Sequence, residues 1–493
     1  MRKLLMASAA ILGATGGIAL AQVAAPSQGQ YAGPYGAGPA ANNNINNWGV
    51  ANTPSGSAAA GPLSTLYAPN TDKVPAPGQI VIRLNGRVNA NIQANYSSFN
   101  TTNSGGNTYK VNPITLGQFM RLYPGFDGTA ANGLHYGAAI ELRQNYVAGN
   151  WSGFNGSTTG NGAASPSSQS SGSTVFVRRA FVYASSDQAG LVRVGMGDGV
   201  LGLFDPCIFI SGCWDAGSGN LGGGDIQSQN MNGNNIPLPF LETQGAEYDN
   251  SKIVYLSPQF FGFDFGFQYA PSQGNGYSNT ANGVSCNQAG AQCVSLTSGA
   301  DPTRWYNQVG VGLRYMHNFG PVDFKTYGFY ETAGKENQTA GTIVGNTAGW
   351  NGKYDNLSFY KFGVAVTAMN FTLAADYIGG AINSQLAMRP TGGANMNAYV
   401  VGLTYANGPI TAGINFENVQ DQGSATLTNV SQRHQYATSM GGAYKVAPGF
   451  QVYAEYMYQY RHQGNFNFAT NAAGAGTRDA SSNGYMLGVV MNW

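Results

Sequence analysis

Residues 80 to 96 alternate strictly between two kinds of side chain. The even positions, from Ile80 to Tyr96, are apolar or small, whereas the odd positions after Val81 hold Arg83, Arg87 and a series of asparagine and glutamine residues. A period of two places the two sets on opposite faces of a β-strand. The run is about three times as long as the five or six residues of a common globular strand. It therefore predicts an unusually long strand with one oily and one wet face.

The same alternation recurs at residues 261–269, 410–417 and 451–461. Counting such segments gives about sixteen strands between Gln79 and Trp493. Short connections at 186–190, 257–261, 318–321, 369–370, 407–408 and 447–449 alternate with long polar segments near 97–114, 148–173, 199–240, 271–304, 333–355, 380–395, 421–432 and 463–482. Short turns that alternate with long loops are typical of transmembrane β-barrels.

Composition agrees with a sheet that is half wrapped in lipid. Only 9% of the residues are charged, whereas about a quarter is usual for a soluble protein. Beyond the first twenty residues no segment supplies the roughly 18 apolar residues of a transmembrane helix. Because a bilayer tolerates a sheet only when it is closed, we expect an all-β, transmembrane antiparallel barrel of about sixteen strands, with short periplasmic turns and long external loops.

The ends of the chain suggest three regions. Met1-Arg2-Lys3, the apolar run to Leu20 and the small residues Ala19 and Ala21 are typical of a secretory signal peptide, which we place at residues 1–21. Residues 22–78 are rich in Ala, Gly, Pro and Asn and are expected to form a flexible segment. Residues 79–493 are then the barrel.

The four cysteines fall into two close pairs, Cys207/Cys213 and Cys286/Cys293. In an exported chain, paired cysteines favour disulfides over free thiols. A zinc site is the rival interpretation, but no histidine lies near either pair and neither spacing fits a zinc motif. We expect each pair to close a small ring within a loop.

Two segments resemble a known family. Arg178-Arg179-Ala180-Phe181-Val182-Tyr183-Ala184, a short turn and Gly190-Leu191-Val192-Arg193-Val194-Gly195 resemble the strands that precede the constriction loop of the general diffusion porins of Gram-negative bacteria. The resemblance spans roughly residues 79–493, although the acidic-Phe-Gly-Gly-Asp stretch of that loop is not recognisable here. It implies a homotrimer of sixteen-stranded barrels in the bacterial outer membrane, each with its third loop folded into the pore. It also implies passive diffusion of small hydrophilic solutes and ions.

The last segment resembles the signal by which outer-membrane barrels are recognised for assembly. Tyr485, Leu487, Val489 and Met491 alternate on one apolar face, and Trp493 stands where Phe is usual. The resemblance implies that the barrel-assembly machinery, membrane lipid and lipopolysaccharide are partners of the chain.

Charge is distributed unevenly around the third long loop. No Lys or Arg occurs from Val194 to Ser251, and the loop is acidic at Asp198, Asp205, Asp215 and Asp225. The preceding segment carries the candidate basic wall, Arg83, Arg87, Arg121, Arg143 and Arg178. If the loop folds inward, acids and arginines face each other across a narrow opening and create a transverse field. We expect Arg178 to face the lumen and Arg179 to face the opposite side.

Three other functions stay open. An enzyme would need a fixed polar constellation, but the four histidines are scattered and no G-x-S-x-G or H-E-x-x-H motif occurs. A substrate-selective channel, for example for sugars, would use pore aromatics such as Tyr453 and Tyr327. A closed surface adhesin would suit the long loops. No cofactor motif is present, and the near-neutral charge gives no basis for nucleic-acid binding.

Overall fold

The computed structural model describes most of the strands and part of the loops. The described residues are 77–98, 101–104, 107–110, 113–144, 175–186, 188–197, 199–201, 251–258, 260–272, 305–335, 354–383, 388–423, 430–447, 450–469 and 472–492, with two short strands at 32–33 and 36–37. Within them, no helix has the length and apolarity needed to cross a membrane.

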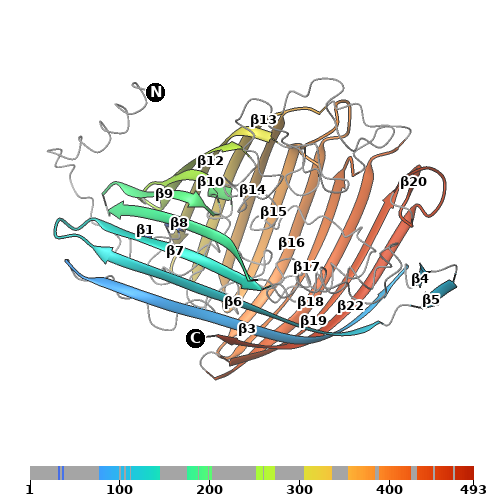
Figure 1. Cartoon of the computed structure of the whole chain (residues 1–493), viewed down its shortest axis with the longest axis horizontal. Coiled ribbons are helices and arrows are strands. Elements are labelled where there is room, and N and C mark those ends of the chain that lie inside the picture. Colours follow the sequence, from blue (N-terminus) through green and yellow to red (C-terminus); the bar gives the residue numbers. More distant parts are fainter. Residues whose placement is uncertain are drawn as a thin grey trace.

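Sixteen antiparallel strands form one closed barrel (Figure 1). Their bounds are β3 (Ile80–Ser97), β6 (Ile114–Thr129), β7 (His135–Gln144), β8 (Phe176–Ser186), β9 (Gly190–Met196), β10 (Ser251–Leu256), β11 (Phe263–Ser272), β12 (Trp305–Asn318), β13 (Val322–Lys335), β14 (Leu357–Ala368), β15 (Phe371–Ala381), β16 (Met396–Asn407), β17 (Ile410–Asp421), β18 (Arg433–Ala447), β19 (Phe450–Gln463) and β22 (Asp479–Asn492). Each strand pairs with its neighbours in the chain, and β22 pairs with β3 to close the ring.

The connections alternate in length as the sequence predicts. At one end of the barrel the strands join through short turns, such as the one between Asn407 and Ile410, where Gly408 has a φ of 55°. At the other end the connections are long. Because β10 begins at Ser251, the third long connection extends to residue 250, about ten residues beyond the predicted end. The last long connection ends earlier than predicted, because β22 already begins at Asp479.

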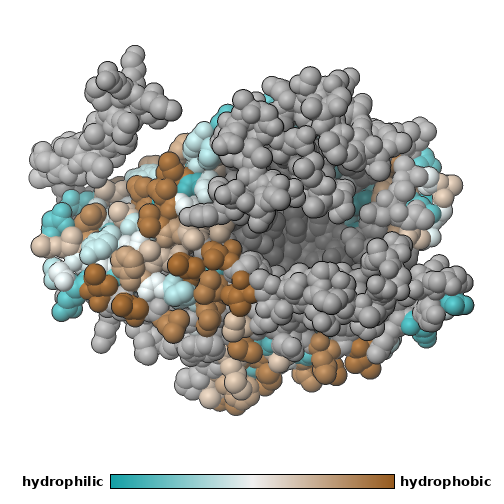
Figure 2. Space-filling view, viewed as in Figure 1, coloured by the Kyte–Doolittle hydropathy of each residue, from teal (hydrophilic) through white to brown (hydrophobic). Residues whose placement is uncertain are grey.

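Alternation assigns one face of each strand to the outside. On β3, Ile82 is 83% exposed while Gln93 is 1% exposed, so the even positions face outward and the odd positions face the interior. The same holds on β11, where Phe265 faces outward and Asp264 faces inward. Figure 2 shows brown, hydrophobic side chains gathered over the described outer surface. The predicted division into an oily outside and a polar inside is confirmed.

Aromatic side chains form two belts on the outer face. Near the short turns, Phe371 packs on Tyr405 with ring centroids 4.9 Å apart. Toward the long loops, Tyr485 lies 5.0 Å from Tyr456 and 6.5 Å from Tyr96. Aromatic rings favour the two lipid–water interfaces of a membrane barrel. These outward-facing rings therefore agree with an outer face that contacts lipid.

Three small hairpins lie outside the barrel sheet. They are β1 (Ala32–Gly33) with β2 (Gly36–Ala37), β4 (Thr101–Ser104) with β5 (Asn107–Lys110), and β20 (Phe466–Asn467) with β21 (Ala472–Ala473). The second lies in the first long connection and the third in the last. Long segments that read as plain loops in the sequence thus contain short strands.

Candidate functional site

The interior of the barrel is strongly charged. Within the described residues, buried cations occur on the inner face of β9, β10, β12, β13, β14, β18 and β19, and buried acids on β6, β7, β11, β13, β15, β17 and β19. The cations are Arg193, Lys252, Arg314, Lys325, Lys361, Arg433 and Arg461, and the acids are Asp127, Glu141, Asp264, Glu331, Asp376, Glu417, Asp421 and Glu455. Charges on the inner face of a membrane barrel favour passage of polar solutes over apolar ones.

Two ion pairs organise the inner wall from β11 to β15. Arg314 binds Asp264 with both ends of its fork, at 3.0 Å from Nε to Oδ1 and 2.6 Å from Nη2 to Oδ2. Nζ of Lys361 lies 3.3 Å from Oδ2 of Asp376 and 5.5 Å from the ring centre of Tyr327. All four charged side chains are buried. Bidentate pairing holds a guanidinium in one orientation, so this wall presents fixed charges.

The segment after β9 turns into the barrel. Val200 is fully buried against the inner face of β10 and β11, and its backbone N–H donates to Oε1 of Gln268. A Cβ on Gly266 would lie 2.8 Å from Cγ1 of Val200 and 3.0 Å from Cδ2 of Leu256, so only a glycine leaves room here. The described start of the third long loop is therefore bound inside the barrel, as expected.

An amide ladder lines the inner face of β3. Asn91 donates to Asn89 at 3.0 Å and Gln93 donates to Asn91 at 2.8 Å. From β19, the hydroxyl of Tyr453 donates to Asn89 at 3.0 Å. The ladder forms because the polar positions follow one another every second residue, which stacks them on one face.

The predicted basic wall comes together along the backbone. Arg87 in β3 is the direct cross-strand partner of Arg121 in β6, and Arg121 is the partner of Arg143 in β7. Arg83 lies four residues before Arg87 in β3. Arg178 falls at a β-bulge in β8, so that Arg179 rather than Arg178 is the cross-strand partner of Glu141. The side chains of these arginines lie outside the described residues.

Most of the predicted loop residues also lie outside the described part of the chain. This applies to the acids Asp198, Asp205, Asp215 and Asp225, to all four cysteines (Cys207, Cys213, Cys286 and Cys293) and to Trp493. Tyr485 of the predicted assembly signal is described: it faces outward from β22 and belongs to the aromatic belt near the long loops.

The interior cations after β8 are not among the site residues that the sequence predicts. Their signal was available, since Arg314 alternates with the outward-facing Leu313 and Lys361 with the outward-facing Tyr360 and Phe362. The structure places them, buried, on the inner face of the barrel.

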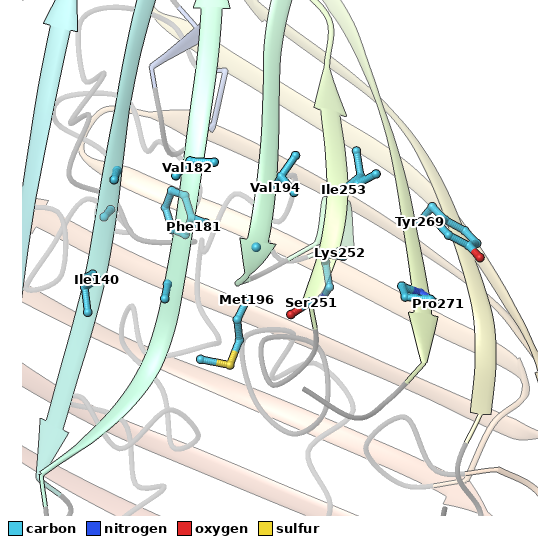
Figure 3. A pocket seen from close by; sticks show the side chains of 14 residues that line it. Ile140, Phe181, Val182, Val194, Met196, Ser251, Lys252, Ile253, Tyr269 and Pro271 are labelled. Atoms are coloured by element: carbon cyan, nitrogen blue, oxygen red, sulfur yellow. The ribbon is translucent and has the colours of Figure 1, made fainter. Parts of the chain in front are cut away.

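A pocket of about 640 Å³ lies where the wall is lowest, across β7 to β11 (Figure 3). Ile140, Val182, Val194 and Ile253 line it and are among the outward-facing, exposed side chains. Its lining is predominantly apolar, and β9 and β10 are only 7 and 6 residues long here. The outward-facing part of this lining belongs to the outer wall, whereas Phe181 and Lys252, which also line the pocket, are buried on the inner face.

Residues 7–465 match the family model described as Gram-negative porin. The chain is a Gram-negative porin. This porin thus belongs to a family of channels rather than of enzymes, and it resides in the bacterial outer membrane, where it serves the passive diffusion of solutes.

Solved structures of similar shape are also porins or outer-membrane proteins. An anion-selective porin from Comamonas acidovorans is 14% identical with a TM-score of 0.47, over 84% of this porin and 100% of that chain. The trimer form of OmpT from Vibrio cholerae is 13% identical with a TM-score of 0.46, over 84% of this porin and 99% of that chain. A mutant of the Rh. blastica porin is 13% identical with a TM-score of 0.44, over 84% of this porin and 100% of that chain. No curated protein matches the chain.

Proposed function

We propose that this porin passes small hydrophilic solutes and ions through a charged constriction formed by the third long loop. The observation that carries the proposal is the inward course of the chain after β9. Val200 is seated on Gly266 and bonded to Gln268, so the loop starts inside the barrel and against the wall that holds the Arg314–Asp264 pair. A loop that starts there narrows the lumen without closing it.

The basic side of the constriction is the row Arg87, Arg121 and Arg143. Cross-strand partners in an antiparallel sheet have Cβ atoms about 5 Å apart, and like charges at that spacing repel. Arg87 also shares the odd positions of β3 with Asn89 and Gln93, which face inward. The acidic loop residues Asp205, Asp215 and Asp225 are the complementary charges, and their attraction to the row would hold the loop across the pore.

Planar-bilayer recording tests this arrangement. Arg121→Gln should shift the reversal potential in a salt gradient toward cation preference. In the wild type the positive charge of Arg121 attracts anions to the narrowest point of the pore, and the variant lacks that charge. Arg478→Gln at the outer rim is the matched control, since it removes the same charge from an exposed site. Equal reversal potentials for the two variants would contradict the proposed wall.

A sugar-selective channel is the second candidate, and the aromatic side chains inside the barrel favour it. They are Tyr123, Phe181, Tyr183, Tyr327, Phe329, Phe359 and Tyr453, and all are buried. Tyr183 donates to Asp127 and Tyr453 to Asn89, so these hydroxyls already have protein partners. That favours simple diffusion. If added maltose blocks the current of the wild type in a saturable way, and does not block that of Tyr453→Leu, the sugar channel is supported instead. A barrel that conducts no current would support an adhesin.

The porin is proposed to be a homotrimer, as its resemblance to the general diffusion porins implies. A strand needs about 9–11 residues to cross the hydrocarbon core, whereas β9 has 7 and β10 has 6. The outer face at these two short strands therefore needs contact with a neighbouring subunit in place of lipid. Light scattering of the detergent-solubilised chain should give three copies per particle, and a single copy would contradict the proposal.

A further inference from the structure

The guanidinium of Arg461 is buried and has no hydrogen-bond partner among the described residues. Arg461 lies on the inner face of β19, two residues before the strand ends at the long-loop side, and is 0% exposed. None of its three side-chain nitrogens finds a hydrogen-bond partner among the described residues. Its Cζ instead lies 5.5 Å from the ring centre of Phe468. A charge held in this way is costly unless a counter-ion completes it.

A second arginine increases the positive charge at this place. Cζ of Arg433, on the neighbouring strand β18, lies 5.3 Å from the same ring of Phe468. Asp421, the cross-strand partner of Arg433, is the one carboxylate among the described side chains that acts on both arginines. Two guanidiniums beside one carboxylate leave an excess of one positive charge on the inner wall.

The site is preorganised by the surrounding loops. Nε of Arg433 donates to Oε1 of Gln463 at 2.8 Å, and Nε2 of Gln463 donates to the carbonyls of Gln422 and Ser431, each at 2.8 Å. These bonds tie both ends of the seventh long connection to β19. The orientation of Arg433 is therefore fixed before any ligand arrives.

Gln435 supplies an additional donor. It is the cross-strand partner of Arg461, it is 1% exposed, and neither its amide nitrogen nor its amide oxygen has a hydrogen-bond partner among the described residues. Unmade hydrogen bonds on a buried amide are costly. Arg461 and Gln435 thus present several unused donors side by side, with an aromatic ring against the guanidinium.

We propose that Arg461, Arg433 and Gln435 form a binding site for a small oxyanion, the phosphate or carboxylate group of a solute that enters the pore. A guanidinium offers only donors, in a fork that fits such an oxyanion. The enclosure by Phe466 and Phe468, whose rings are 5.0 Å apart, favours a compact group. The inference rests on the proposed function, because the ligand arrives through the mouth of the channel.

Inorganic phosphate is the probe, added to the detergent-solubilised full chain with sodium chloride at equal ionic strength as the reference. The wild type should show a thermal unfolding midpoint that rises with phosphate and saturates. Arg461→Met keeps the contact with Phe468 and should weaken phosphate binding about tenfold to a hundredfold, the loss expected for one charged hydrogen-bonding group. Gln435→Leu should weaken it less, and Arg478→Gln should leave it unchanged.

The unfolding midpoint in chloride alone separates a binding role from a structural one. Arg461→Met removes a buried charge that has no hydrogen-bond partner among the described residues and should match or exceed the stability of the wild type in chloride. A structural role of the arginine would instead make the variant less stable than the wild type. The proposed site would be overturned if phosphate did not raise the unfolding midpoint of the wild type. It would also be overturned if phosphate raised the midpoints of Arg461→Met and Gln435→Leu as much as that of the wild type. Bilayer conductance without phosphate tests the channel function by itself. Failure of the proposed function and failure of the oxyanion site are therefore distinguishable.

Discussion

Gly266 leaves the space that Val200 fills. A Cβ at position 266 would lie 2.8 Å from Cγ1 of Val200, closer than two carbon atoms approach without displacement. The glycine on β11 and the valine after β9 are thus a matched pair, and together they determine where the third long loop enters the barrel.

Gly266→Val should displace the start of the loop from the wall. Overpacking of this kind costs about 1–3 kcal/mol, enough to release a short contact while the barrel persists. We expect single-channel conductance to rise and to become noisier in planar bilayers. Phe267→Leu, which alters the outward face of the same strand, is the control. A Gly266→Val channel with wild-type conductance would show that the loop does not narrow the pore.

Asp264→Asn should destabilise the barrel by about 3–5 kcal/mol, since it leaves the buried guanidinium of Arg314 without its carboxylate. Unfolding in urea, followed by the change in electrophoretic mobility, measures the difference. The double variant Asp264→Leu with Arg314→Met removes both charges and should recover most of the loss. A double variant as unstable as the single one would mean that the pair itself stabilises the fold.

Met369→Gly should stabilise the porin by about 1 kcal/mol. Met369 and Asn370 form the turn between β14 and β15 with φ values of 48° and 70°, and a side chain in this left-handed region costs about 1–2 kcal/mol. Met369 is 84% exposed, so its removal leaves no cavity. Met369→Ala keeps the same backbone cost and should give no gain in the urea midpoint.

The rim near the long loops should lose stability in alkali. The hydroxyl of Tyr460 donates to Oδ1 of Asp479 at 2.5 Å. Asp479 lies closer to the long loops than the polar, outward-facing Ser481 and Asn483, so this hydrogen bond is outside the lipid-facing zone. The hydrogen bond to this carboxylate raises the pKa of Tyr460 from 10.0 to about 12. Because the folded pKa is the higher one, the stabilisation is complete below about pH 10 and is lost as the pH rises to about 12.

The measurement is the unfolding free energy from about pH 9 to about pH 12. Wild type and Tyr444→Phe, a change at the opposite rim, should decline together. Tyr460→Phe should decline less, since it has no phenol to titrate. A Tyr460→Phe profile parallel to that of the wild type would rule out this contact as the cause.

The four cysteines should resist alkylation when the chain is unfolded without reductant. We propose the pairings Cys207–Cys213 and Cys286–Cys293 from their spacing in an exported chain. Peptide mapping should recover each pair as one linked fragment. Cys207→Ser should then free one thiol, at Cys213, and leave the other pair linked. Four labelled cysteines in the wild type would contradict both pairings.

Much of the fold could be predicted from the sequence because lipid imposes a simple rule on every strand. Ile82 and Phe265 had to face outward and Gln93 and Asp264 inward, whatever the packing inside. Strand ends were harder to predict, since polar residues near Asp479 suit a loop and an exposed strand end equally well. The bulge at Arg178 was also invisible, because one extra residue changes the register without changing the composition.

The site could be predicted only in part. Charge alone groups Arg87, Arg121 and Arg143 in the sequence, but their cross-strand register depends on turn lengths that alternation does not give. The pairing of Arg314 with Asp264 joins two strands across a long connection, so spacing in the sequence contains no trace of it. Arg461 falls on the polar side of the alternation over residues 451–461, yet nothing in the sequence shows that its guanidinium has no hydrogen-bond partner among the described residues.

The pairing of β22 with β3 also bears on how this porin must be made. The first and last strands of the ring are separated by nearly the whole barrel sequence, so no ribosome-bound fragment can complete the cylinder. Until they meet, β3 and β22 each expose an unsatisfied backbone edge that would recruit other chains. A newly made porin chain therefore needs a chaperone until its first and last strands pair. Deletion of β22 should yield aggregates rather than a smaller pore.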